Sequence, residues 1–227
     1  MEAIILAGGF GTRLKHIVSD VPKPMAPINN KPFLVFILDY LKNYDCTKVI
    51  MAVGYKSNSI KEYFKNSYKG IDITYSDEDN PLGTGGAIKK ALMNTAEEEI
   101  FILNGDTFFN CNLNEMRITH ESSSCDITVA VKRMKDYCRY GSVVIKNNKI
   151  IKFIEKQKTN EGVINAGIYL INKKIFEKIS EVEFSFEQII LDSLIYSMCA
   201  YESKGYFIDI GVPEDYYKAQ KDFVNER

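Results

Sequence analysis

The chain has 227 residues, of which 45% are hydrophobic and 26% are charged, a composition typical of a folded protein with one sizeable core. Its 29 basic and 30 acidic side chains nearly cancel, which leaves no strong positive field to attract nucleic acids. The sequence has no apolar run long enough to span a membrane, and its opening MEAIILAGG lacks the features of a signal peptide. We therefore expect a cytoplasmic protein that binds neither nucleic acid nor membrane.

The first half of the chain alternates short β-branched runs with amphipathic stretches. The pattern predicts strands at 2–6, 48–53, 71–75 and 100–104, and helices at 33–43, at about 58–66 with Ser57 as cap, and at 85–94. This alternation indicates βαβ units and an α/β fold, with a Rossmann-like, mostly parallel sheet and helices on both faces. In such sheets, ligands bind beyond the carboxyl ends of the strands.

The second half changes character. It predicts strands at 126–132, 142–146, 149–154, 165–171 and 205–209, a turn at Asn147-Asn148, and helices at 185–196 and 214–224, the latter starting at Pro213. We interpret this half as antiparallel strands that cover the site, within a single domain spanning residues 1–227.

The cysteines and histidines show no metal-binding or redox spacing. No two cysteines form a CxxC pair, and His16 and His120 lie far apart. We expect reduced thiols at Cys46, Cys111, Cys125, Cys138 and Cys199.

The loop GGFGTR, directly after the first predicted strand, is the strongest motif. It is not a Walker A loop, because Gly-Lys-Ser/Thr is absent, and the third glycine of a dinucleotide fingerprint is replaced by Leu14. Glycines still allow backbone N–H groups to approach phosphate oxygens. Arg13 adds a planar donor that grips phosphate with two hydrogen bonds. The loop therefore predicts a phosphate site at the end of the strand.

Residues 6–14, LAGGFGTRL, and then Val21-Pro22-Lys23-Pro24-Met25 resemble the signature of the sugar-1-phosphate nucleotidyltransferases. The resemblance continues across nearly the whole chain. It implies one domain that binds a nucleoside triphosphate, a sugar 1-phosphate and Mg²⁺, with a nucleotide part at about 1–110 and a sugar part at about 111–227. It leaves a homodimer open.

In the reaction that the resemblance implies, an oxygen of the sugar phosphate attacks the α-phosphorus of the triphosphate, and pyrophosphate leaves. Two anions meet, so cations must screen their repulsion and stabilise the charge that builds up. Arg13 suits the departing pyrophosphate, and Lys23, held between two prolines, is implied to reach the α-phosphate or the sugar phosphate. No general base is needed, because the attacking phosphate is already ionised. With Asp106, these two residues are the catalytic candidates.

Two aspartates are the candidate magnesium ligands, since Mg²⁺ prefers carboxylate oxygens and bridges substrate phosphates. Asp106 follows the predicted strand that ends at Asn104. Asp209 lies in Phe207-Ile208-Asp209-Ile210-Gly211-Val212-Pro213-Glu214, which resembles the family's C-terminal Asp-x-Gly-x-Pro-Glu segment. The resemblance implies a metal held between the two.

A second glycine-rich stretch, at residues 75–87, is implied to recognise the base, because glycines permit a flat ring to approach the backbone. Its Pro-Leu-Gly-Thr-Gly-Gly-Ala is similar to that of guanylyltransferases for mannose-type sugars. Glu78 is either an acceptor for the donors on guanine or a surface acid. The predicted nucleotide-binding residues are Leu6, Ala7, Gly8, Gly9, Gly11, Thr12, Arg13, Glu78, Gly83, Thr84, Gly85, Asn104 and Gly105.

The sugar side rests on three further matches to the family, at Glu155-Lys156, at Asn165-Ala166-Gly167 and at Gly141. Glu155-Lys156 resembles a pair that binds sugar hydroxyls and the sugar phosphate, although Gln157 stands where a proline often follows. The predicted sugar-phosphate-binding residues are Gly141, Glu155, Lys156, Asn165, Ala166 and Gly167.

We expect the protein to transfer GMP from GTP to D-glycero-α-D-manno-heptose 1-phosphate, for the synthesis of surface or capsule polysaccharide precursors. The short chain and the Gly-Thr-Gly-Gly-Ala-Ile stretch favour this substrate by resemblance. Mannose 1-phosphate with GTP, or uridylyl, thymidylyl or cytidylyl transfer to another hexose 1-phosphate, remains open. A regulatory homologue without activity is disfavoured, because Arg13, Lys23, Asp106 and Asp209 are all present. The downstream motifs disfavour transfer to a molybdopterin cofactor.

Overall fold

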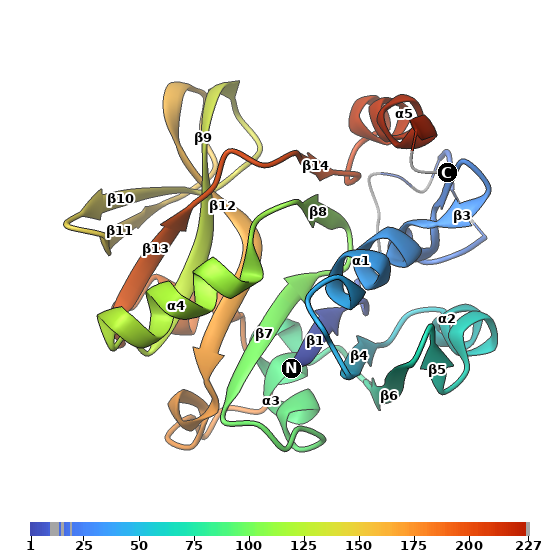
Figure 1. The fold of residues 1–227 in the computed structure, drawn as a ribbon, viewed down its shortest axis with the longest axis horizontal. Helices are drawn as coiled ribbons and strands as arrows, with labels where there is room; N and C mark the ends of the chain where they lie inside the picture. Colours follow the sequence, from blue (N-terminus) through green and yellow to red (C-terminus); the bar gives the residue numbers. More distant parts are fainter. Residues whose placement is uncertain (10–13, 15, 19, 226–227) are drawn as a thin grey trace.

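A computed structural model describes residues 1–9, 14, 16–18 and 20–225 of the chain. The centre of its main sheet is parallel and matches the predicted βαβ units (Figure 1). Four parallel strands lie side by side in the order β7 (Glu99–Asn104), β1 (Glu2–Leu6), β4 (Lys48–Val53) and β6 (Ile71–Asp77). The short β5 (Ser67–Tyr68) pairs with β6 in the antiparallel sense at one edge.

The second half of the chain extends this sheet beyond β7. The long strand β12 (Thr159–Asn172) runs antiparallel to β7 and to β9 (Ile127–Tyr137), and β13 (Met198–Glu202) lies parallel to β9. The hairpin of β10 (Ser142–Lys146) and β11 (Lys149–Ile154) completes ten strands. The α/β prediction is confirmed. Because β12 pairs directly with β7, the added strands belong to the same mixed sheet.

Helices pack on both faces of the sheet, as predicted. α1 (Phe33–Lys42), α2 (Ser57–Phe64), α4 (Leu113–Ser123) and α5 (Pro213–Asp222) contribute to one buried cluster, and α3 (Gly83–Leu92) contributes to the other. Alternate side chains of β1 serve the two clusters, with Ala3 and Ile5 on one face and Ile4 on the opposite face. This alternation explains why β1 reads as a continuous apolar run.

Short elements complete the described chain. They are the 3-10 turns Lys23–Met25, Lys173–Phe176 and Phe223–Asn225, the π-helical turn Glu187–Leu191, the pair β2 (Pro27–Ile28) and β3 (Lys31–Pro32), and the pair β8 (Thr107–Phe109) and β14 (Phe207–Asp209).

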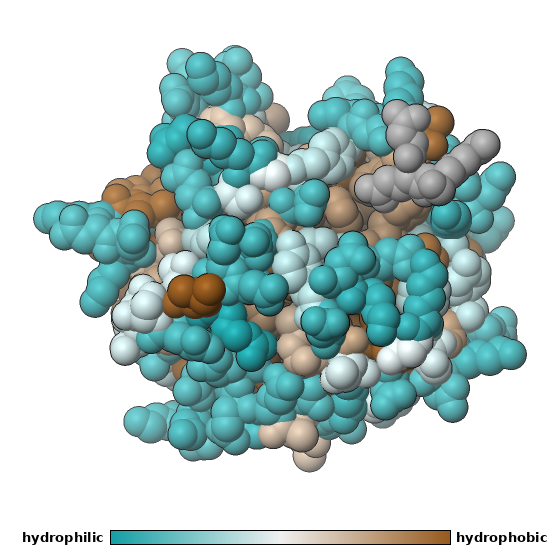
Figure 2. All heavy atoms as spheres, viewed as in Figure 1, coloured by the Kyte–Doolittle hydropathy of each residue, from teal (hydrophilic) through white to brown (hydrophobic). Residues whose placement is uncertain are grey.

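The exterior agrees with the balanced composition. Hydrophilic residues dominate the face shown in Figure 2, with only small separate hydrophobic areas. Over the residues that the structure describes, no helix has both the length and the apolar character needed to cross a bilayer.

Two local predictions were wrong, and one helix was missed. A helix was expected at 185–196, but only the π-helical turn Glu187–Leu191 forms, because the preceding Phe184 backbone is hydrogen-bonded to α3. Helix α4 was missed: its buried side chains are only Leu113, Met116 and His120, and the Asn112 side chain caps it. Ser57 is the first residue of α2 and does not cap it.

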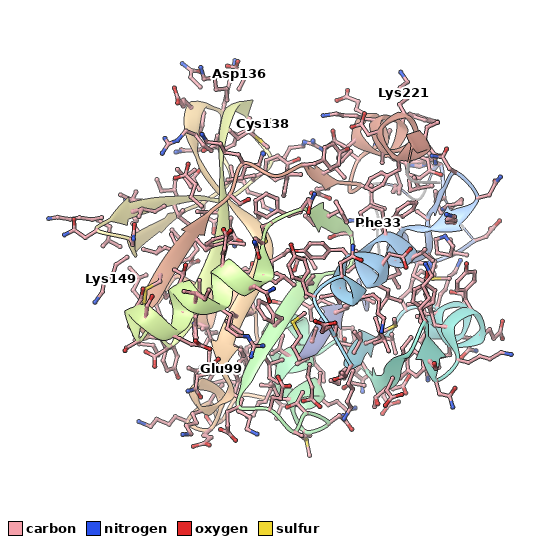
Figure 3. All side chains as sticks on the ribbon, viewed as in Figure 1. Phe33, Glu99, Asp136, Cys138, Lys149 and Lys221 are labelled. Atoms are coloured by element: carbon pink, nitrogen blue, oxygen red, sulfur yellow. A yellow bond between two sulfur atoms is a disulfide. The ribbon has the colours of Figure 1, made fainter. Side chains whose placement is uncertain are left out.

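The reduced state predicted for all five cysteines was also wrong, because Cys125 and Cys199 are disulfide-bonded. Strand β13 lies beside β9, and this parallel pairing brings two cysteines that are 74 residues apart in sequence to a Cα–Cα distance of 6.0 Å. Cys46 and Cys111 are free and buried, and the free Cys138 is exposed (Figure 3). The pairing depends on a strand that the sequence analysis did not predict.

The glycines at the start of α3 make room for the chain segment 182–184. A Cβ at Gly85 would lie 2.1 Å from the Phe184 ring, and one at Gly86 would lie 2.2 Å from the Val182 carbonyl oxygen. Gly83 has a positive φ of 70° and would place a Cβ 2.5 Å from the Phe184 carbonyl oxygen. These glycines therefore serve a packing contact within the protein.

We predict that Gly85→Ala destabilises the protein although it lies in a helix. Helix propensity alone favours alanine by about 1 kcal/mol. Overpacking against a buried ring costs about 1–3 kcal/mol, so the steric effect should dominate. Urea unfolding would measure this as a lower midpoint at an unchanged m-value.

The matching control is the same substitution in a Phe184→Ala background, which removes the ring. There Gly85→Ala should be neutral or stabilising relative to Phe184→Ala alone. Equal destabilisation in both backgrounds would show that the Phe184 ring is not the obstacle.

Candidate functional site

Two cavities adjoin beyond the carboxyl ends of the parallel strands. The first, of about 390 Å³, is lined by the ends of β1 and β7 and the start of α3. The second, of about 250 Å³, is lined by residues of β11, β12, β14 and the 139–141 segment. Among the described lining residues, only Asn104 and Glu187 border both cavities. Two separate ligands can therefore meet here.

Most of the predicted nucleotide-binding residues line the first cavity. They are Leu6, Gly8, Gly9, Glu78, Gly83, Thr84 and Asn104, together with Lys23 and Asp106. Gly11, Thr12 and Arg13 lie outside the described residues. The structure therefore brings together segments that are up to a hundred residues apart in the sequence.

Three other predicted residues are not among those that line this cavity. The Ala7 backbone N–H donates to Ala52, which extends the parallel pairing of β1, and the Gly105 N–H donates to Leu6. The Gly85 N–H donates to Phe184. Nucleotide contact at Ala7, Gly85 and Gly105 stays a prediction, and their described contacts are with the protein itself.

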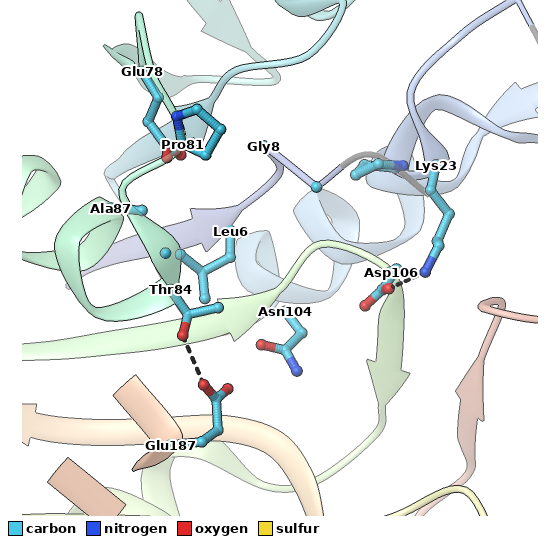
Figure 4. Close-up of a pocket in the computed structure, with 13 residues that line it drawn as sticks. Leu6, Gly8, Lys23, Glu78, Pro81, Thr84, Ala87, Asn104, Asp106 and Glu187 are labelled. Atoms are coloured by element: carbon cyan, nitrogen blue, oxygen red, sulfur yellow. Dashed lines mark hydrogen bonds and ion pairs between the residues drawn. The ribbon is translucent and has the colours of Figure 1, made fainter. Parts of the chain in front are cut away.

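Glu78 lies at the end of the first cavity that is farther from Lys23 (Figure 4). Its Oε2 accepts a hydrogen bond of 3.0 Å from the Leu82 N–H, and a Cβ at Gly8 would lie 2.7 Å from its Oε1. Burial raises the pKa of this carboxyl, which is partly offset by the Leu82 hydrogen bond. Glu78 also borders a smaller hollow of about 240 Å³ beside Tyr55. The carboxylate is thus a fixed acceptor at the cavity wall.

Lys23 and Asp106 form an ion pair at the other end of the first cavity (Figure 4). The Lys23 Nζ lies 2.6 Å from Asp106 Oδ2, and the side chains are 17% and 32% exposed. The Lys23–Met25 turn presents the lysine, and Asp106 follows the end of β7. Both side chains are therefore partly accessible from the first cavity.

Asp209 is brought to Asp106 by the pairing of β8 with β14. This antiparallel pair sets Asp209 opposite Thr107, and the Ile210 N–H donates to the Asp106 carbonyl oxygen at 3.0 Å. Burial and the negative charge of Asp106 raise the pKa of Asp209 to about 6, against the lowering effect of the Gly211 N–H hydrogen bond. Asp106 lines the first cavity and Asp209 lines the second.

This pair of carboxylates could hold a divalent cation. Burial raises the pKa of Asp209 most, and a bound cation would relieve the repulsion from Asp106 that raises it further. Within the described chain, no group of three or more histidine, cysteine, aspartate or glutamate side chains is arranged to hold a metal. A two-carboxylate site is typical of Mg²⁺, which keeps several waters and binds substrate phosphates.

All six predicted sugar-phosphate-binding residues line the second cavity, namely Gly141, Glu155, Lys156, Asn165, Ala166 and Gly167. The Asn165 side chain is fixed, because its Nδ2 donates to the Tyr169 hydroxyl and its Oδ1 accepts from the Gly167 N–H. Gly167 has a positive φ of 75°, and a Cβ there would lie 2.7 Å from Asn104 Nδ2. The glycine lets this strand approach the boundary between the cavities.

Several lining residues were missed by the sequence analysis. Arg139 faces the second cavity and is paired with Asp215 of α5. Asp192 and Glu187 lie in the segment that was misassigned as a regular helix. Burial raises the pKa of Asp192, and the nearby Glu155 and Glu187 raise it further. In the sequence, each of these positions is a single charged residue in an amphipathic stretch, and no motif marks it as part of a site.

A sheet with this topology, and a site with glycine loops, a lysine and two facing carboxylates, define a nucleotidyltransferase. The chain belongs to the nucleotidyl transferase family, whose sequence model matches residues 2–226. The family resemblance read from the sequence is confirmed.

Relatives of similar length are known. The chain is 51% identical over 226 residues to D-glycero-alpha-D-manno-heptose 1-phosphate guanylyltransferase of Aneurinibacillus thermoaerophilus, with 98% of each chain covered. It is 50% identical to the protein of the same name from Campylobacter jejuni, covering 96% of this chain and 97% of that one. The crystal structure of HddC from Yersinia pseudotuberculosis complexed with GMP-PN has a TM-score of 0.88 at 37% identity, covering 98% and 99%.

We predict that Asp209→Asn stabilises the metal-free protein at pH above about 6. The raised pKa of Asp209 means that the folded state binds a proton more tightly than the unfolded state. Its stabilising contribution is therefore present at low pH and is lost as the pH rises through about 6. Asparagine keeps the acceptor for Gly211 and removes the charge.

Thermal unfolding in chelator would test this between about pH 4 and pH 8. The melting temperature of Asp209→Asn should exceed that of the wild type at pH 8, with the difference shrinking toward pH 4. Asp72→Asn, at an exposed position of β6, is the control and should show no such trend. A constant difference across the range would contradict the charge explanation.

Proposed function

We propose that this protein transfers GMP from GTP to D-glycero-α-D-manno-heptose 1-phosphate and releases pyrophosphate. One observation carries the proposal: Asp106 borders the first cavity, Asp209 borders the second, and their carboxylates interact. The phosphates of two ligands would therefore meet at one charged point. The heptose 1-phosphate guanylyltransferases with about half of their residues in common with this chain favour GTP and this sugar.

The proposed reaction needs no protein nucleophile. An ionised oxygen of the sugar 1-phosphate forms a bond to the α-phosphorus of GTP. The bond from that phosphorus to the oxygen bridging to the β-phosphate breaks, and pyrophosphate leaves with the electron pair. The protein's task is to align the two phosphates and to stabilise the added charge.

Lys23 is the described cation best placed for that task. In the free protein its ammonium is paired with Asp106 at 2.6 Å. A bound phosphate would share the Lys23 ammonium with Asp106 or replace Asp106 as its partner. The lysine would then stabilise the negative charge that builds up on the oxygens of the reacting phosphate. We assign Arg13 to the leaving pyrophosphate by family resemblance.

We propose Mg²⁺ as the cofactor, with Asp106 and Asp209 as its protein ligands. When bound, the ion would neutralise phosphate charge and orient the triphosphate. The two carboxylates and Lys23 together carry a net charge of about −1, which leaves the site attractive to a divalent cation.

For the base, we propose that Glu78 Oε1 accepts hydrogen bonds from guanine. The Leu82 N–H already holds Oε2, so the remaining oxygen faces Gly8 and the cavity. Guanine offers N1–H and the 2-amino group as donors, whereas uracil and thymine offer only one N–H on that edge. Gly8, by lacking a side chain, leaves Glu78 accessible.

For the sugar, we propose contacts from the six predicted residues of the second cavity, led by Glu155, Lys156 and Asn165. The nucleotide part at about 1–110 and the sugar part at about 111–227 then belong to one catalytic domain. Pocket lining supports this division, with three exceptions: Glu187 of the sugar part borders the first cavity, and Asn104 and Thr107 of the nucleotide part border the second. A cytoplasmic location and a role in surface polysaccharide synthesis stay part of the proposal.

The proposed function predicts one preferred pair of substrates. A matrix of GTP, UTP, dTTP and CTP against heptose, mannose and glucose 1-phosphates, followed by pyrophosphate release, should give its highest kcat/KM for GTP with the heptose phosphate. A higher value for any other pair would overturn the proposed specificity but not the reaction class.

Glu78→Gln should lower the preference for GTP over ITP, which lacks the 2-amino group. A charge-assisted hydrogen bond is worth roughly tenfold or more in kcat/KM, so the GTP:ITP ratio should fall by about that factor. Glu62→Gln, at an exposed position of α2, should leave the ratio unchanged. An unchanged ratio in Glu78→Gln would remove this residue from base recognition.

The metal proposal predicts that chelator stops pyrophosphate release and that added Mg²⁺ restores it. Asp106→Asn should lower kcat by a factor on the order of 100 or more at saturating Mg²⁺, because a ligand carboxylate is lost. Isothermal titration of Mg²⁺ in the presence of GTP should show weaker binding to the variant. Full activity in chelator would exclude a metal-dependent reaction.

A further inference from the structure

Glu187 has a position that no sequence motif explains. It lies at the start of a short π-helical turn and borders both cavities: the first, proposed for the nucleotide and called the nucleotide cavity below, and the second, proposed for the sugar and called the sugar cavity. In Figure 4 it reaches toward Thr84 from the side of the cavity opposite Glu78. Its carboxylate is thus placed between the two proposed substrates.

Thr84 holds one oxygen of this carboxylate. The Phe186 N–H donates to Thr84 Oγ1 at 2.9 Å, which occupies the hydroxyl as an acceptor. The hydroxyl proton is then directed to Glu187 Oε2 at 2.6 Å, and the Ser185 hydroxyl also lies 3.0 Å from Oε2. Among the described residues, no hydrogen bond reaches Oε1. The geometry therefore fixes the carboxylate and leaves Oε1 to a ligand.

The surrounding charge indicates which part of a ligand fits. Glu155 and Asp192 face the same cavity, and Glu187 and Glu155 raise the pKa of Asp192 beyond the effect of its burial. A phosphate beside these carboxylates would be repelled, whereas neutral hydroxyl groups would donate hydrogen bonds to them. This side of the cavity thus suits the hydroxyl groups of a sugar ring and not its phosphate.

We propose that Glu187 is a specificity-determining residue, whose Oε1 accepts a hydrogen bond from a hydroxyl of the sugar while Oε2 is anchored by Thr84 on the nucleotide side. The inference rests on the proposed function, because it assumes a sugar 1-phosphate in the second cavity. It adds a coupling between the sites: the helix that borders the nucleotide also orients an acceptor for the sugar.

The first test compares kinetic constants of Glu187→Gln and wild type. Exchanging a charged acceptor for a neutral amide should raise the KM for the sugar 1-phosphate roughly tenfold or more, with less than about a twofold change for GTP. Thr84→Val, which removes one of the two hydroxyl donors to Oε2 and leaves that of Ser185, should raise the same KM by a smaller factor. Thr84→Ser keeps the hydroxyl and should lose less than Thr84→Val. Glu183→Gln, an exposed carboxylate in the same segment, is the control.

The second test identifies the partner hydroxyl with sugar 1-phosphates that each lack one hydroxyl group. For one analogue, Glu187→Gln should cause no further loss of kcat/KM, because the interaction is already absent. Equal losses on every analogue, or an effect confined to the KM for GTP, would overturn the proposal. Melting temperatures of the variants separate loss of folding from loss of recognition. The Thr84 variants test the orientation of the Glu187 carboxylate through the sugar KM, without removing the carboxylate itself.

The two proposals fail in different ways. If wild-type protein prefers another nucleotide or another sugar 1-phosphate, the proposed function fails, and the Glu187 experiment is run with the preferred pair. If wild type has the proposed activity and Glu187→Gln leaves the sugar KM unchanged, only the present inference fails.

Discussion

Strand pairing brings two carboxylates from distant parts of the chain together at the site of this protein. Asp106 follows a strand of the parallel half and Asp209 belongs to a short strand near the C-terminus. The β8–β14 pairing holds the two segments together by backbone hydrogen bonds and places the two carboxylates near each other. The free protein compensates in part through Lys23 and through the raised pKa of Asp209. A bound cation would relieve this repulsion, and stabilisation of charge at this point is what the proposed joining of two phosphates requires.

A second constraint connects the two cavities. The glycines at the start of α3 allow the segment 182–184 to approach the helix backbone, and Thr84 and Glu187 continue this contact into the cavity wall. The segment continues into Glu187, which lines both cavities, so its docking shapes the boundary between them. Packing and recognition are therefore coupled here, and glycines that resemble a ligand cradle also serve the protein's own core.

The two cavities differ in what their chemistry selects. The nucleotide cavity presents a held carboxylate at one end and a lysine with a carboxylate at the other, which suits a base and a phosphate chain. The sugar cavity is lined by acceptors and amides, with Lys156 and Arg139 as its basic residues among those described. The reaction class follows from the charged junction, whereas the base and the sugar depend on the hydrogen-bonding groups farther from it.

The sequence by itself determined the parallel half, and most of the residues it predicted for the site line one of the two cavities. The run at 2–6, the loop at 8–13 and Asp106 could be placed at one sheet edge, because βαβ connections bring the carboxyl ends of parallel strands together. Motif order also placed all six sugar-side residues in one cavity. Contacts made by weakly patterned segments could not be read this way. The proximity of Asp209 to Asp106 was implied only by family resemblance, and the β8–β14 pairing accounts for it physically. The Cys125–Cys199 bond and the position of Glu187 depend on strand pairing and docking between distant segments, and only the tertiary structure decided them.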